Sequence, residues 1–229
     1  MLKSSKHNIA IFDTFKTRKD KYTGEAKRQR GIIAHLAIEQ SPEFRTRTSI
    51  AHVIAKKHGI LWQNIYSGIF RDLDEALIPS GVIKEGGRLP LRRGPRALQL
   101  EGVPFYELTE SGLLVASSIE ELGNDRVNIL EKYLGSLPAK DQKETSIIAG
   151  LLLLIKKAPG FAFKIVNEYI YAYSSGLIDN IAPLDIEKLR NVISKQAIIE
   201  KELVEAVIKM ENSQREVVMQ FFGEISQQF

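Results

Sequence analysis

The hydrophobic pattern of the chain changes its period at Pro79, and this change divides the N-terminal half into two kinds of structure. Before Pro79, apolar residues recur at the 3.6-residue spacing of helices, over residues 25–40, 48–59 and 61–77. After it, apolar and polar residues alternate as in short strands, over residues 81–87 and 97–108. Helical spacing resumes after Thr109, a residue type favoured at helix N-caps. We therefore predict three helices, two strands and a fourth helix.

Beyond Gly123 every apolar pattern is helical, so the fold class is predicted to be mainly α. Helices are expected over residues 125–134, 141–157, 161–174, 183–210 and 213–227. The first 24 residues are polar and basic apart from one apolar patch, and we expect a loosely held arm with a short strand over residues 8–12. Three parts are thus predicted: an arm (1–24), a domain with a hairpin (25–122) and a helical domain (123–229).

Positive charge is concentrated in the first half of the chain. Residues 1–60 contain 13 Lys and Arg against 5 Asp and Glu, whereas residues 124–229 contain 13 against 14. Between the two predicted strands lie four arginines, in a stretch stiffened by prolines: Arg88, Arg92, Arg93 and Arg96. This distribution favours a polyanion as the partner of the first half. A basic surface that only keeps the chain soluble is the alternative.

The second and third predicted helices fit a helix-turn-helix, in which Ala55 lies where the helices cross, Gly59 in the turn and Ile65 facing inward. The end of the second predicted strand and the start of the fourth helix follow in the segment FYELTESG, from Phe105 to Gly112. On these residues the chain from Glu25 to Leu122 resembles the winged-helix transcription regulators of the MarR-like and PadR-like kind. Its loop between the strands is longer and richer in proline than theirs. The resemblance implies a winged helix that binds double-stranded DNA, with the third helix in the major groove and the wing on a neighbouring groove.

Four polar residues of the third helix are the predicted base contacts: Gln63, Asn64, Ser67 and Arg71. Amide side chains pair with N6 and N7 of adenine, and arginine binds guanine or a phosphate. Asp72, Asp74 and Glu75 follow and are expected to repel phosphate, so only the first two turns would approach DNA. An ordinary solvated helix face is the alternative interpretation.

The remaining predicted DNA contacts are basic. Arginines of the wing loop suit a narrow minor groove, although the same loop could instead pair with acidic helices of the protein. Phosphate contacts are expected from residues that precede the second helix, lie near its end or lead the first helix: Arg45, Arg47, Thr48, Lys56, Lys57, Lys27, Arg28 and Arg30.

Several classes of protein are disfavoured by what the sequence lacks. It has no cysteine, and no nucleotide-binding glycine motif or nucleophile elbow. Its four histidines are scattered, so we expect neither a metal nor a cofactor, and no enzyme. The most apolar run, residues 146–155, is about half of a membrane span. A cytoplasmic protein without membrane partners is predicted.

The helical tail carries near-heptad apolar residues that predict a homodimer seam: Leu203, Val207, Met210, Val217 and Phe221. Its aromatic residues favour core packing or a subunit interface, and no residue specifically supports a small-molecule effector. The leading hypothesis is a dimeric regulator of transcription. Two alternatives stay open: a scaffold whose winged helix docks another protein, and an accessory protein of DNA replication or segregation.

Overall fold

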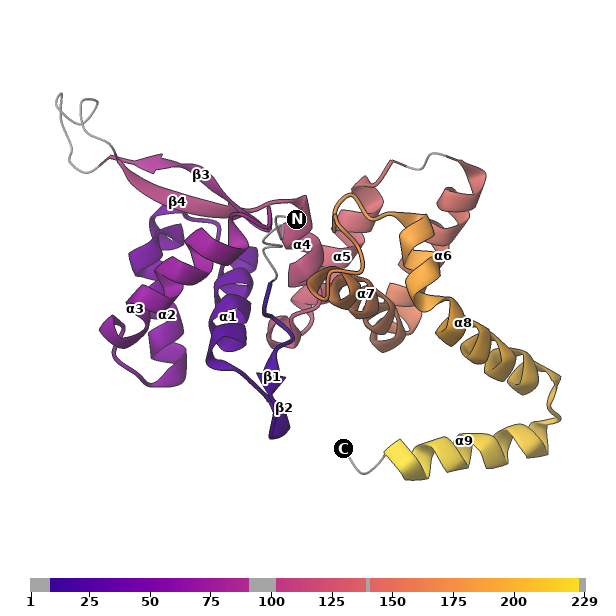
Figure 1. The fold of residues 1–229 in the computed structure, drawn as a ribbon. Helices are drawn as coiled ribbons and strands as arrows, with labels where there is room; N and C mark the ends of the chain where they lie inside the picture. Colours follow the sequence, from indigo (N-terminus) through magenta and orange to yellow (C-terminus); the bar gives the residue numbers. More distant parts are fainter. Residues whose placement is uncertain (1–8, 91–101, 139–140, 227–229) are drawn as a thin grey trace, which may run out of the picture.

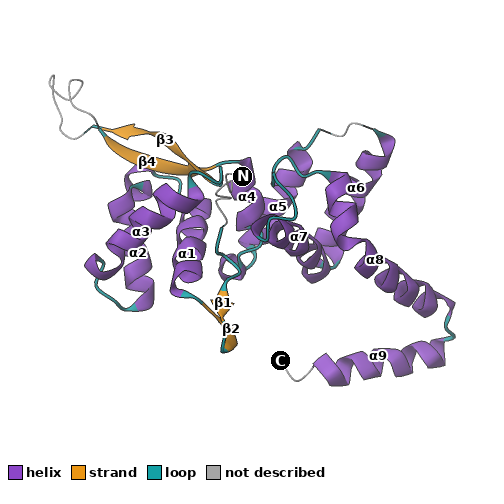
Figure 2. Ribbon diagram, viewed as in Figure 1, coloured by secondary structure: helices purple, strands orange, loops and turns teal. Residues whose placement is uncertain are grey.

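The computed structural model describes residues 9–90, 102–138 and 141–226, and it is mainly helical with two small antiparallel sheets (Figure 1, Figure 2). The mainly helical class predicted from the sequence is confirmed. One group of helices, α1 to α3, lies beside a second group that begins with α4 (Figure 1). No helix within the described part of the chain is long and apolar enough to cross a membrane.

Three helices form the first group: α1 (Gly24–Ile38), α2 (Arg47–His58) and α3 (Gln63–Arg71). Thr23 and Thr46 cap the first two, each accepting a backbone N–H with its side-chain oxygen. Gly59 ends α2 in the left-handed conformation, with φ of 64°. A 3₁₀ turn, Pro42–Arg45, connects α1 to α2, and α3 continues directly into a π-helical segment, Asp72–Leu77.

A hairpin of β3 (Ile83–Leu89) and β4 (Val103–Leu108) follows, pairing Ile83 with Leu108 and Leu89 with Val103. Its far end projects beyond the three helices (Figure 1). The register shifts between Glu85 and Gly87. Gly87 has φ of 151°, and a Cβ there would lie 2.9 Å from the Phe105 ring, so this bulge needs glycine. An isolated bridge from Thr46 to Phe105 holds the hairpin against the start of α2.

The second group contains α4 (Glu110–Ala116), α5 (Asp125–Ser136), α6 (Gln142–Lys157), α7 (Pro159–Ser174), α8 (Ile186–Lys209) and α9 (Asn212–Ser226). A 3₁₀ turn, Glu120–Leu122, precedes α5. One continuous cluster of buried apolar side chains runs from Ile9 to Leu189 and includes both groups of helices. The cluster therefore continues across residue 122, where the boundary between the two domains was predicted.

The N-terminal segment differs from its prediction. Residues 9–12 form no strand, but Ile9 and Ile11 are buried in the core, and Gln29 accepts a 2.7 Å hydrogen bond from the N–H of Ala10. The segment is therefore held by the core at residues 9–11. A small hairpin of β1 (Thr14–Phe15) and β2 (Arg18–Tyr22) follows, which the sequence did not lead us to expect.

Candidate nucleic-acid interface

Helix α3 has one exposed polar side and one fully buried apolar side. Gln63, Asn64, Ser67 and Arg71 are exposed, as the predicted base contacts must be. Opposite them, Ile69 and, in the π-helical segment, Leu73 have no exposed surface. We call the four exposed residues the α3 stripe. Its side chains are not needed for the core, so they can contact another molecule.

A row of aromatic rings borders the α3 stripe. His52 of α2 contacts Trp62 with ring centroids 4.7 Å apart, Trp62 contacts Tyr66 at 5.2 Å, and Tyr66 contacts Phe70 at 4.5 Å. The His52–Trp62 contact joins α2 to the start of α3, and the other two contacts line up rings along α3 in the tilted or edge-to-face geometry that aromatic pairs prefer. Sequence reasoning missed this row, although Trp62, Tyr66 and Phe70 recur every four residues and so had to share a side of the helix.

Arg47 is not available as a phosphate contact, which corrects the prediction made for it. Its Nε donates a 2.6 Å hydrogen bond to the hydroxyl of Tyr106, and its other nitrogens bind the carboxylate of Asp74. The guanidinium also lies 4.4 Å from the ring centre of Phe70. Burial acts to lower the pKa of Arg47, but the hydrogen bonds that Arg47 donates to Asp74 and Tyr106 outweigh it and raise that pKa. Arg47 thus fastens α2 to β4 and to the π-helical segment.

Arg45 is also engaged within the protein and is removed from the predicted phosphate contacts. Its Nε donates a 2.7 Å hydrogen bond to the carbonyl of Glu39, and its Nη1 lies 3.6 Å from Glu107. Thr48, the third residue predicted near this helix start, is exposed, with its hydroxyl 3.5 Å from that of Tyr66. Of the three, Thr48 alone has its side chain on the surface.

Two arginines of α1 form internal ion pairs instead of a basic first turn. Arg28 donates two hydrogen bonds to Asp72, of 2.7 and 3.2 Å, and Arg30 donates two to Glu121, of 2.9 and 2.5 Å. The side chain of Arg30 is only 2% exposed. Burial acts to raise the pKa of Glu121, but the hydrogen bonds from Arg30 prevail and lower it. Neither arginine is placed to bind a phosphate.

These pairs change the electrostatics predicted for the end of α3. Asp72, expected to repel phosphate, is buried and paired with Arg28, and Asp74 is paired with Arg47. Each carboxylate therefore has a guanidinium beside it, which reduces its field at the surface. The acidic end of the helix is a weaker barrier to DNA than its sequence indicates.

The lysines predicted to contact phosphates lie at two different places, the end of α2 and a cavity between α1 and α2. Lys56 and Lys57 are both exposed near the end of α2. Lys57, however, lines a cavity of about 630 Å³ between α1 and α2, together with Lys27, Ile38 and Val53. Because this cavity lies on the side of α2 that faces α1, Lys57 and Lys27 are not part of the α3 stripe.

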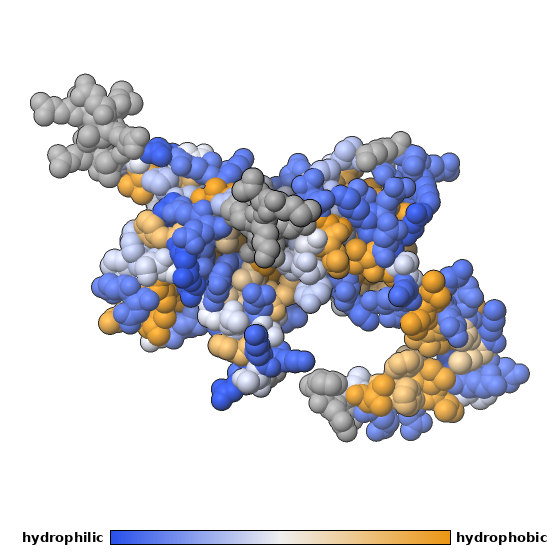
Figure 3. All heavy atoms as spheres, in the orientation of Figure 1, coloured by the Kyte–Doolittle hydropathy of each residue, from blue (hydrophilic) through white to orange (hydrophobic). Residues whose placement is uncertain are grey.

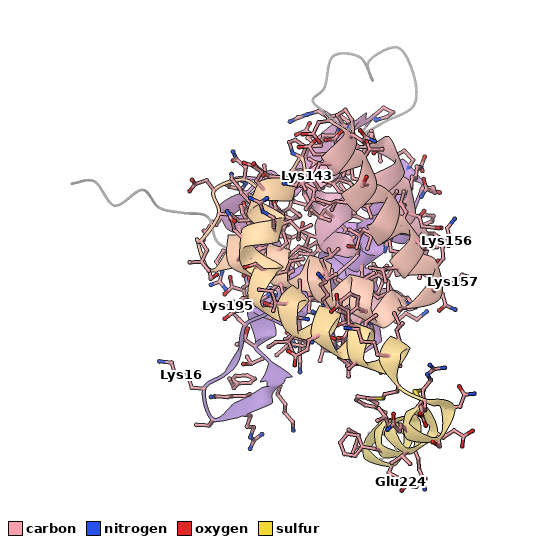
Figure 4. All side chains as sticks on the ribbon, turned by 90° about the vertical axis from the view of Figure 1, so that its right-hand side faces the viewer. Lys16, Lys143, Lys156, Lys157, Lys195 and Glu224 are labelled. Carbon is pink, nitrogen blue, oxygen red and sulfur yellow. The ribbon has the colours of Figure 1, made fainter. Side chains whose placement is uncertain are left out.

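Of the four arginines predicted to bind DNA through the wing, Arg88 lies in the described part of the chain. Arg88 on β3 donates a 2.7 Å hydrogen bond to Glu85 and has 43% of its side chain exposed. Arg92, Arg93 and Arg96 lie outside the described residues. A second basic projection was missed: the β1–β2 hairpin exposes Lys16, Arg18, Lys19 and Lys21. It leaves the molecule on a different side from the β3–β4 hairpin (Figure 1), and Lys16 extends outward from it (Figure 4).

Comparison with protein-family models, with curated proteins and with solved structures finds no match to this chain. The case for any function therefore depends on the chain's own residues. Among residues 9–90, 102–138 and 141–226, no group of three or more His, Asp or Glu side chains is placed to hold a metal ion.

Proposed function

We propose that residues 25–122 form a winged helix-turn-helix that binds double-stranded DNA, and that the protein regulates transcription in the cytoplasm. In this proposal α3 enters the major groove and the β3–β4 hairpin, with its arginine-rich loop, lies along a neighbouring minor groove. The observation that carries it is the α3 stripe, four polar side chains exposed on a helix whose opposite side is anchored in the core.

The order of the elements supports the same proposal. Helices α1, α2 and α3 precede a two-stranded hairpin, and Gly59 provides the left-handed turn between α2 and α3. The exposed amides of Gln63 and Asn64 lie in the first turn of α3, where recognition helices contact base edges. Arg71, at the other end of α3, can reach a guanine or a phosphate.

The first prediction tests the α3 stripe directly. Replacing Gln63, Asn64 and Arg71 together with alanine removes three of its four polar side chains. We expect at least a tenfold loss of affinity for a labelled duplex, because a good base contact contributes about 1–3 kcal/mol. Loss of Arg71 should also make the slope of log K against log salt shallower by about 1 if it contacts a phosphate. Fluorescence anisotropy over a range of salt concentrations measures both.

A matched control uses the same residue types on exposed positions elsewhere. Gln142→Ala, Asn128→Ala and Arg190→Ala change α6, α5 and α8, and this triple variant should bind duplex DNA as the unmodified protein does. Equal losses in both triple variants would mean that DNA is held by nonspecific charge alone. No duplex binding by the unmodified protein at low salt would exclude the proposed function.

One observation favours the scaffold alternative. The turn between α2 and α3 exposes Ile60 by 44% and Leu61 by 69%, and apolar surface gathers at that end of the helices (Figure 3). Apolar residues beside a recognition helix suit a protein partner better than a phosphate backbone. Co-purification of a partner that is lost on Leu61→Ser, without any duplex binding, would favour this alternative.

A further inference from the structure

The C-terminal end of the chain leaves the body of the molecule without entering its core. The buried residues of α8 are Ile186 and Leu189, both in its first turn, and no residue of α9 is buried. Figure 1 and Figure 4 show the later turns of α8 leaving the other helices and α9, which carries Glu224, turning back from the end of α8 apart from the body of the molecule. We call residues 195–226 the C-terminal arm.

The arm exposes more apolar surface than a segment that stays in contact with water usually does. Ten large apolar side chains are exposed on it by 39–70%: Ile198, Ile199, Leu203, Val204, Ile208, Val217, Met219, Phe221, Phe222 and Ile225. Taken over all sides of the two helices, these ten side chains present on the order of 1,000 Å² of surface, the same order as the ~800 Å² that each partner contributes to a standard protein interface. Exposed apolar surface of this size marks an interaction site.

The apolar residues are arranged in stripes. On α9, Val217, Val218, Phe221, Phe222 and Ile225 share one side at 100° per residue, Glu216 and Gln220 lie on the other side, and Glu224 borders the stripe. On α8, the positions spaced by four, three and four residues form a seam: Ile199, Leu203, Ala206 and Met210. Val204 and Ile208 form a second stripe on the far side of the helix, about 150° around it from the seam at 100° per residue.

The two helices of the arm are joined at a defined corner. Arg215 of α9 donates hydrogen bonds of 3.2 and 3.1 Å to the carbonyls of Val207 and Met210. These bonds give partners to carbonyl groups at the C-terminal end of α8. Helix α9 has only 15 residues, and an isolated helix of about 12–15 residues is marginally stable in water. A stable α9 therefore requires an apolar partner that covers its stripe.

We propose that this partner is the arm of a second copy of the chain. Two arms bring together two α8 seams and two α9 stripes, which is the set of apolar faces that a four-helix bundle encloses. An interface made from the same surface on both copies closes on itself as a two-fold dimer.

The charges of the arm favour this occupant over others. Residues 195–226 contain four basic and six acidic residues, so a phosphate backbone or an anionic lipid surface meets an excess of like charge. A second copy meets charges of both signs. Lys195, Glu202 and Lys209 alternate in sign at seven-residue intervals beside the seam, where coiled-coil helices form ion pairs.

The second prediction follows from the seam. Leu203→Glu combined with Phe221→Glu places a charge in both apolar stripes. Light scattering coupled to size-exclusion chromatography should give twice the 25.8 kDa chain mass for the unmodified protein and the single chain mass for this variant. Ile198→Glu is the matched control: Ile198 is 67% exposed on α8, but Lys195, Glu202 and Glu205 surround it, and the dimer should persist.

A cross-link tests the seam without relying on a disrupted variant. The chain has no cysteine, so Leu203→Cys introduces the sole thiol, and a short bismaleimide should yield a covalent dimer. Ile198→Cys, on the charged side, should yield much less. A single chain mass at every concentration overturns the proposal, as does equal cross-linking at both positions. Binding of the arm to vesicles of anionic lipid, without dimerisation, would overturn it as well. None of these results depends on DNA binding.

Discussion

At the scale of single residues, the arginines that the sequence indicates as phosphate contacts mostly serve the fold. Arg28 reaches Asp72 across 44 positions of sequence, and Arg30 reaches Glu121 across 91. Local periodicity cannot reveal such partners, because it describes only neighbours within a helix or strand. The same argument applies to Arg47, whose partners Asp74 and Tyr106 are brought near by the π-helical segment and the hairpin.

The third prediction concerns the pair of Arg28 and Asp72. Asp72 has a fully buried carboxylate, so Arg28→Met leaves a buried charge without its partner and should cost about 3–5 kcal/mol of unfolding free energy at pH 7. The double variant with Asp72→Asn should recover much of this loss, because both charges are then absent. Lys201→Ala removes an exposed pair with Glu205 and should change stability by less than ~1 kcal/mol. Urea denaturation measures all three.

The pH dependence of that effect has a definite sign. Burial raises the pKa of Asp72, although Arg28 acts to lower it. A carboxyl whose pKa is raised by folding binds its proton more readily when folded, so its ionisation destabilises the fold as pH rises from 3.8 through the raised value. Without Arg28 the pKa rises further. The penalty of Arg28→Met should therefore be smaller at pH 5 than at pH 7, and an equal penalty at both would contradict the assignment.

At the scale of elements, the sequence indicated helices α1, α2 and α4–α9 and the β3–β4 hairpin, but it treated residues 61–77 as one helix. In the structure α3 ends at Arg71 and the next six residues form a π-helical turn. Asp72, Leu73, Ala76 and Leu77 are all buried in this segment, whereas the face predicted from the sequence included only Leu73 and Ala76. No sequence signal distinguishes these two helical periods over six residues.

The fourth prediction uses two glycines in opposite roles. Gly59 ends α2 with φ of 64°, so Gly59→Ala places a Cβ in the left-handed region and should cost about 1–2 kcal/mol. Gly150 lies exposed in the middle of α6 with open space around its Cα, so Gly150→Ala should add about 0.5–1 kcal/mol. Thermal and urea denaturation compare them. A stabilising Gly59→Ala would argue against a strained turn between α2 and α3.

At the scale of the whole molecule, basic charge and exposed apolar surface lie at opposite ends of the chain. The basic excess of residues 1–60 was visible in the sequence. Two of these arginines, Arg28 and Arg30, form ion pairs within the protein. The α3 stripe and the two hairpins remain as candidate DNA contacts. The near-heptad spacing of the tail was also visible. Its exposure was not, because a stripe of apolar residues looks the same whether it faces the core or a second copy.

The fifth prediction joins the two ends of the molecule. If the arms dimerise the chain, each particle presents two α3 stripes, and binding of the first to a long duplex raises the effective concentration of the second. The monomeric variant Leu203→Glu/Phe221→Glu should then bind a long duplex at least about tenfold more weakly, while its affinity for a duplex that holds one stripe is unchanged. Anisotropy with duplexes of both lengths measures this difference. An equal loss on the short duplex would instead mean that the arm acts on the DNA-binding surface itself, because a single site gains nothing from a second copy.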